Sequence, residues 1–240
     1  MDMKRHYYED VQLFSSGVII FWFAVLMVLL ATFPFLFKNY FVYVANYIAI
    51  NIIVVIGLNI LVGYTGLISL GHAGFFAIGA YGTIIFMTKW SLPFLLALPL
   101  AALVAALFGF LLGLPALRLE GPYLTIATLG FGLTITQVIG KLDLFGGRQG
   151  LHAPELLIGP WHLDTDRSFY YLVMIITVIL TIFARNLIKT RVGRAFIAIR
   201  DADLAAETMG VNLVLYKTLA FAISAFYAGV AGGLYAFVLR

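Results

Sequence analysis

The residues most able to do chemistry lie in Gly63–Gly82, a stretch with six glycines in 20 residues and no charged side chain. Thr65, Ser69 and His72 place hydrogen-bond donors and acceptors among the glycines. Because glycine weakens a helix and exposes its backbone, this density lets helices approach closely or lets one break beside a polar cavity. The freed backbone groups and the hydroxyls can bind a polar ligand of zero net charge without burying an ion.

His72 is the ionisable residue of this stretch, and an ionisable residue within an apolar run is a functional candidate by default. The run just upstream adds the amide of Asn59. We therefore regard the stretch as a candidate transport path. The alternative is a glycine-lined contact between helices, in which His72 bonds a neighbouring carbonyl. The candidate path residues are Asn59, Thr65, Gly66, Ser69, Gly71, His72 and Gly74.

A second segment, Thr190–Asn212, is charged and lies between two apolar runs. We expect Asp201 or Asp203 to cap a short helix that ends at Gly210. Such a helix suits docking onto a soluble partner. The alternative is a basic loop that only fixes the membrane topology, but basic residues alone do not explain the acidic ones. The candidate docking residues are Arg200, Asp201, Asp203, Ala205, Ala206, Glu207 and Gly210.

Other kinds of site have no support in the sequence. The chain has no cysteine, so it has no thiolate ligand or cysteine nucleophile. Its four histidines are far apart and lack metal-ligand spacing. It also lacks a phosphate-binding loop with the glycine-lysine-serine pattern. We expect no catalytic centre, no metal site and no cofactor.

The elements that position these residues are membrane helices. Of the 240 residues, 63% are hydrophobic and 11% are charged, whereas a soluble domain has about a quarter charged residues. The basic residues form no stripe with stacking aromatics, so nucleic-acid binding is not expected. Uncharged runs predict about seven transmembrane helices, near 17–37, 41–62, 66–88, 92–117, 121–140, 168–184 and 218–239. Their continuous aliphatic content favours an all-α polytopic bundle over a barrel.

Lysine and arginine predict the orientation of this bundle. A cytoplasmic N-terminus, with residues 1–16 as a cytoplasmic tail, puts nine basic residues inside and five outside. Six of the nine lie between Arg185 and Lys217. The loop Lys141–Arg167 is then external.

Several ordered motifs carry a resemblance to a known family. They are Gly57–Leu61, Gly63–Gly66, Ser69–Phe76, Gly121–Leu129, Gly146–Gly147 with Gly150–Leu151, Arg191–Arg194, Ala198–Asp201, Ala205–Glu207 and Met209–Gly210. In these stretches the sequence resembles the membrane permease of branched-chain amino-acid ABC importers. The resemblance spans roughly residues 57–236.

The resemblance implies a transporter subunit rather than an enzyme, in the plasma (inner) membrane of a bacterium or archaeon. It implies a second, homologous permease that completes the translocation path, two cytoplasmic ATPases that hydrolyse ATP, and a soluble protein that delivers Leu, Ile or Val. Leu204–Gly210 resembles the coupling loop of ABC importers, whose general pattern is Glu-Ala-Ala-x-x-x-Gly. Leu204 stands where that pattern has its glutamate, so the contacts of that glutamate do not carry over.

Two alternatives and one departure remain. Permeases for urea or short amides resemble this chain in both segments, and an ATP-independent secondary transporter belongs to another class. The latter has paired broken helices in inverted repeats, whereas only one strongly glycine-rich segment is present here. Family members continue for two or three more helices, so we expect the permease domain, residues 17–240, to be incomplete at its C-terminus.

Overall fold

The computed structural model describes residues 17–116, 121–142, 145–147, 150–154, 156–158, 161–162 and 165–239. The predicted tail, residues 1–16, lies outside these ranges. The α-helices are α2 (Gly17–Leu36), α3 (Asn39–Leu58), α4 (His72–Lys89), α5 (Phe94–Ala116), α6 (Pro122–Lys141), α7 (Asp166–Lys189), α8 (Arg191–Asp201), α9 (Asp203–Thr208) and α10 (Leu213–Val238). A π-helix, η1 (Asn59–Tyr64), continues α3, and the two-residue strands β1 (Leu157–Ile158) and β2 (Trp161–His162) pair antiparallel. The predicted all-α class is confirmed.

Five helices of the described residues are long and apolar enough to cross a membrane: α3 with η1, α5, α6, α7 and α10. Large apolar side chains point outward from them, for example Val55, Ile126 and Ile175. Exposed aliphatic side chains along a helix of this length suit contact with lipid. The chain is a multi-pass membrane protein. The first predicted span contributes a shorter apolar helix within α2, and α4 has 18 residues.

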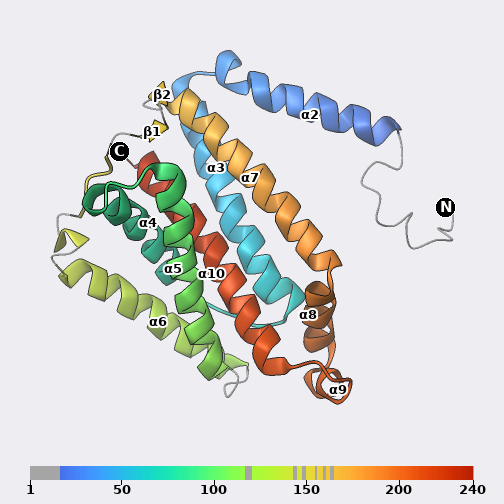
Figure 1. Ribbon diagram of the computed structural model, residues 1–240. Helices are drawn as coiled ribbons and strands as arrows, with labels where there is room; N and C mark the ends of the chain where they lie inside the picture. The colour runs from blue at the N-terminus through green and yellow to red at the C-terminus, as the bar shows by residue number, and fades with distance from the viewer. Residues whose placement is uncertain are drawn as a thin grey trace.

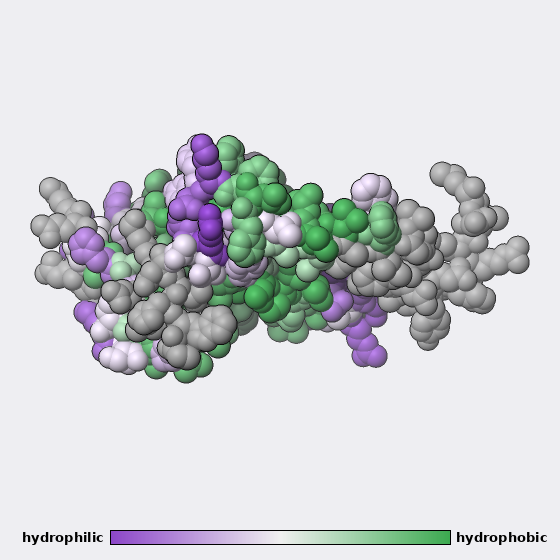
Figure 2. All heavy atoms as spheres, turned by 90° about the horizontal axis from the view of Figure 1, so that it is seen from above, coloured by the Kyte–Doolittle hydropathy of each residue, from purple (hydrophilic) through white to green (hydrophobic). Residues whose placement is uncertain are grey.

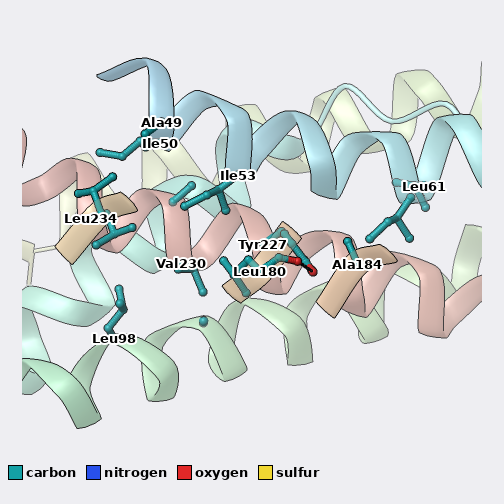
Figure 3. Packing of buried hydrophobic residues seen from close by; sticks show 14 of the residues in the cluster. Ala49, Ile50, Ile53, Leu61, Leu98, Leu180, Ala184, Tyr227, Val230 and Leu234 are labelled. Atoms are coloured by element: carbon teal, nitrogen blue, oxygen red, sulfur yellow. Dashed lines mark hydrogen bonds between the residues drawn. The ribbon is translucent and has the colours of Figure 1, made fainter. Parts of the chain in front are cut away.

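Helix α10 is the central element of the bundle and contacts α3, α4 and α5 (Figure 1). Along α10, Tyr227, Val230 and Leu234 are buried against Ile50 and Ile53 of α3 and side chains of neighbouring helices (Figure 3). Small residues let these helices approach closely. Gly109 and Gly113 of α5 lie directly against α10, where an added Cβ would meet backbone atoms of Phe221 and Thr218.

The two ends of the bundle differ (Figure 1). Helices α8 and α9 lie at one end, and the β1–β2 pair and the C-terminal end of α10 lie at the other. Seen from above, at the end opposite α9, hydrophobic side chains dominate the visible surface and hydrophilic ones form small separate groups (Figure 2). Helix α2 diverges from the bundle and is held by hydrogen bonds from the Tyr170 and Tyr171 hydroxyls to the carbonyls of Leu30 and Ala31.

Three helix boundaries differ from the predicted ones. The predicted span 218–239 begins at Leu213, so that Lys217 lies within α10. The predicted span 66–88 begins instead at His72, and residues 66–71 form no helix. The predicted span 168–184 extends to Asp166–Lys189, because charged residues are tolerated at the ends of a membrane helix where they reach water. The late start of α4 leaves an irregular segment between η1 and α4.

Candidate functional site

The end of α3 changes from α-helix to π-helix at Asn59, a change that hydrophobic periodicity does not reveal. Wider turns of this kind occur often at functional sites. The Thr65 hydroxyl donates to the Ile60 carbonyl at 3.0 Å, across the last turn of η1. Gly66 then adopts a positive φ of 74°, a conformation that glycine adopts without steric cost. The helix therefore ends here, which is one of the two outcomes that the glycine density allows.

The segment after the break is fixed to α6. The Thr128 hydroxyl accepts a hydrogen bond from the Leu70 backbone N–H at 3.0 Å, and the Ser69 hydroxyl accepts one from the Gly71 N–H at 3.3 Å. A Cβ on Gly71 would collide with the Thr128 carbonyl oxygen, and one on Gly74 would lie 3.1 Å from the Cα of Gly132. These glycines therefore let the backbones of α4 and α6 meet.

His72, the first residue of α4, is bonded to α10. Its Nε2 lies 2.6 Å from the Ser224 hydroxyl oxygen, and that hydroxyl donates to the Gly57 carbonyl at 2.7 Å. Since the serine proton goes to the carbonyl, Nε2 must carry the imidazole proton and donate it. The expected partner of His72 was a carbonyl, and the structure instead inserts a serine between the two. Sequence reasoning did not identify Ser224, which lies far along the chain in an apolar helix.

The candidate path residues occupy three separate interfaces. Thr65 and Gly66 lie beside α8, Gly71 and Gly74 contact α6, and His72 contacts α10. The Ser69 hydroxyl bonds only within its own segment, to the Gly71 N–H. Asn59 is exposed on η1, and its side chain lies across Gly63. Of these residues, Thr65 and Gly66 line a cavity beside α8.

The charged segment forms two helices rather than one. Ala202, with an extended backbone, separates α8 from α9 and is the N-terminal cap of α9 without a side-chain cap bond. The prediction that Asp201 or Asp203 caps this helix is wrong, because both carboxylates bond basic side chains instead. The predicted end at Gly210 is confirmed. Gly210 has a φ of 85°, its N–H bonds the Glu207 carbonyl, and the next N–H bonds the Ala206 carbonyl, as in a Schellman motif.

Asp203 pairs with Lys217, whose ammonium lies 2.5 Å from a carboxylate oxygen. The Lys217 side chain is only 11% exposed, so this pair fastens α9 to the first turns of α10. Leu204 of α9 is 80% exposed and Met209, directly after the helix, is 85% exposed, and Glu207 between them in the chain is also exposed. Sequence reasoning missed the two apolar side chains, although Leu204 replaces a glutamate in the family pattern.

Arg200 brings the two candidate segments together. Its Nη1 donates to the Gly63 carbonyl at 3.1 Å, and its Nε and Nη2 each donate to Oδ1 of Asp201 at 3.0 Å. A cavity of about 380 Å³ lies at this contact, between the segment after η1, the start of α6 and the α8–α9 junction. Both charged and aliphatic side chains line it. The arrangement can bind a ligand or transmit movement, and the described residues that line it include no acid–base pair poised on a nucleophile.

Comparison with known proteins gives consistent relatives. The family model for the branched-chain amino acid transport system permease component matches residues 40–240. The high-affinity branched-chain amino acid transport system permease proteins LivM of Salmonella typhimurium and Escherichia coli are 37% and 38% identical over 88% of this chain. A probable branched-chain amino acid transport permease protein LivM of Methanocaldococcus jannaschii is 26% identical over 57% of it.

The chain spans about half the length of the curated relatives it matches, 56% for the two bacterial proteins. No solved structure gives a significant match. The family model covers α3 to α10, which include the glycine-rich break and both charged helices. The chain therefore belongs to the family of branched-chain amino acid transport system permease components.

Proposed function

We propose that this chain is a membrane permease subunit of an ATP-driven importer for branched-chain amino acids. The observation that carries the proposal is the hydrogen bond from Arg200 to the Gly63 carbonyl, in a chain of this permease family. It joins the charged segment that resembles a coupling loop to η1, the π-helix that ends α3 just before the irregular segment. A movement of α8 can thereby reach the interior of the bundle.

Helix α9 is the proposed contact for a cytoplasmic ATPase. Leu204 of α9 and Met209, directly after the helix, are 80% and 85% exposed, and the helix is fixed to α10 by the Asp203–Lys217 pair. Exposed apolar side chains flanked by a charge such as Glu207 suit a partner groove with an apolar centre and a polar rim. The basic residues around α8 favour the cytoplasmic side for this end and for the N-terminus.

The remaining partners follow from the family. We propose that a second, homologous permease completes the translocation path, that two ATPases bind at the cytoplasmic end, and that a soluble protein delivers the amino acid from outside. The plasma membrane of a bacterium or archaeon is the proposed location. The relatives support this assembly because they are named as permease proteins of transport systems.

Uptake in proteoliposomes tests the proposal. The permease complex, purified from its native membrane, is reconstituted with the soluble binding protein outside and ATP inside, and uptake of radiolabelled leucine is measured. We expect uptake that depends on ATP. Unlabelled isoleucine and valine should reduce the uptake of labelled leucine, whereas urea and acetamide should not. Accumulation of urea in place of leucine would support the short-amide alternative, and leucine uptake without ATP would support a secondary transporter.

A further inference from the structure

We propose that the cavity between Thr65–Ile68, the start of α6 and the α8–α9 junction binds the free amino acid at the exit of the translocation path. This inference rests on the proposed function for the identity of the ligand and for the cytoplasmic position of the cavity. The cavity itself is defined by residues of four separate segments, and its volume of about 380 Å³ lies within the range of small-molecule sites.

The charged lining has unused bonding capacity of both signs. A guanidinium has five N–H groups, and Arg200 uses three of them on Asp201 and Gly63. The other two have no partner among the described residues. Oδ2 of Asp201 and Oδ1 of Asp203 are likewise without one in the described parts of the chain. A carboxylate can bind the free N–H groups, and an ammonium can bind the free carboxylate oxygens.

These opposite charges are close together. Arg200 and Asp201 are adjacent and in contact at 3.0 Å, and Asp203 follows two residues later with Lys217 beside it. A simple anion would meet the two carboxylates, and a simple cation would meet Arg200 and Lys217. An α-amino acid carries its carboxylate and ammonium on one carbon and therefore matches both signs at once.

Much of the rest of the lining is aliphatic. Leu124 and Ile199 are each 3% exposed, and Leu67 and Ile68 line the same cavity. Burying a branched aliphatic side chain against such residues removes apolar surface from water and stabilises the complex. Charges of both signs beside an aliphatic surface select a zwitterion with an apolar side chain. Urea, which has neither a charge nor an alkyl group, lacks both features.

Equilibrium binding in the absence of ATP tests the site separately from transport. The permease complex from its native membrane is washed free of soluble binding protein, and binding of radiolabelled leucine is measured in detergent. We expect saturable binding that leucine displaces and that 4-methylpentanoate, isopentylamine and glycine displace at least about tenfold less well, because each lacks one of the three recognised features. Equal displacement by 4-methylpentanoate or isopentylamine would overturn the zwitterion site.

Two variants with matched controls locate the binding. Arg200→Gln should weaken leucine binding by about tenfold, whereas Arg194→Gln, an exposed arginine of the same helix that does not line the cavity, should not. Ile68→Trp should weaken binding by filling the cavity, whereas Leu70→Trp, exposed on the same segment but outside the lining, should not. Because Ile68 is 51% exposed, its variant tests the site even where Arg200→Gln fails to fold.

The outcomes separate this inference from the proposed function. Undetectable binding to the unaltered complex, or unchanged binding in both cavity variants, would overturn the site. If leucine uptake persists in that case, the permease function stands without it. Photo-activated leucine that labels peptides containing Leu67 or Ile199 would support the site, and labelling confined to other peptides would overturn it.

Discussion

Arg200 of α8 and Gly63 of the π-helix η1 are 137 positions apart in the chain, and a 3.1 Å hydrogen bond joins the arginine Nη1 to the glycine carbonyl oxygen. The last turn of a helix leaves carbonyls without partners inside the helix, so a guanidinium is a suitable donor there. The bond makes the conformation of the interrupted membrane helix dependent on the position of α8. A permease driven by a cytoplasmic ATPase, as proposed above, needs such a link between its cytoplasmic helices and its membrane helices.

The ion pair between Asp203 and the buried Lys217, which holds α9 against α10, can be tested by measuring the stability of variants. Asp203→Asn removes the partner of an ammonium whose side chain is 11% exposed, and we expect a loss of about 2 kcal/mol, between the values for surface and fully buried pairs. Lys217→Met in the same chain should recover most of this loss, because no unpaired charge is then left. The measurement is thermal unfolding of the purified protein in detergent. A double variant as unstable as Asp203→Asn would contradict the pairing.

The exposed side of α9 predicts a coupling defect without loss of fold. Leu204→Asp places a charge on a side chain that is 80% exposed, and we expect stimulation of ATP hydrolysis by the binding protein to fall by about tenfold, since a partner groove would have to desolvate the charge. Glu207→Arg should also reduce the stimulation. Thr208→Asp adds the same charge to the same helix as Leu204→Asp and serves as the control. If Thr208→Asp reduced the stimulation of ATP hydrolysis equally, the added charge rather than the lost apolar contact would be the cause.

Ser224 connects His72 to Gly57, and its removal should be more harmful than a change of His72. Ser224→Ala leaves the buried His72 Nε2–H without its partner, for which we expect a loss of stability of about 1–3 kcal/mol and lower uptake. His72→Gln retains a hydrogen-bonding group, so we expect a mild loss of uptake. The control is Thr83→Val, which removes a buried hydroxyl that bonds only a carbonyl of its own helix. Equal stability of the Ser224→Ala and Thr83→Val proteins would show that the hydrogen bond between His72 and Ser224 does not stabilise the fold.

Substitutions at glycines that contact α6 can be compared with a substitution at a glycine that has open space beside it. Gly71→Leu places a side chain against the Thr128 carbonyl oxygen, and Gly74→Leu places one against Gly132 and Phe131. We expect both variants to lose uptake and to yield less folded protein, because the backbones of α4 and α6 must separate. Gly130→Leu lies on α6 with no atom within 4 Å of its Cβ position, so it should be tolerated. Uptake and folded yield are measured on the same samples, and normal values for Gly71→Leu would contradict the close contact.

The absence of native cysteine makes the topology simple to test, because each introduced cysteine is the sole thiol of the chain. A cysteine at His152, which is exposed between α6 and α7, should react with a membrane-impermeant maleimide in intact cells. A cysteine at Ala198 of α8 should react only after the cells are opened. The opposite pattern would reverse the orientation and place the proposed ATPase contact outside the cell.

Helix positions and several local structures could be predicted from the sequence alone. Uncharged runs of the right length determine which segments form membrane helices, because each backbone group in lipid must bond within its own helix. Glycines at Gly66 and Gly210 fix local breaks, since both adopt positive φ.

Only the tertiary structure decided which polar groups meet. Whether Asp203 capped a helix or paired with Lys217 depended on where α10 begins relative to α9, a relationship that local propensities do not encode. In the sequence, Ser224 is a small residue within an apolar helix, and only the fold places it between His72 and Gly57. The Arg200–Gly63 bond likewise required two segments from opposite parts of the chain to meet at one end of the bundle. Periodicity describes the face of a single helix, whereas these contacts arise from the packing of several helices at once.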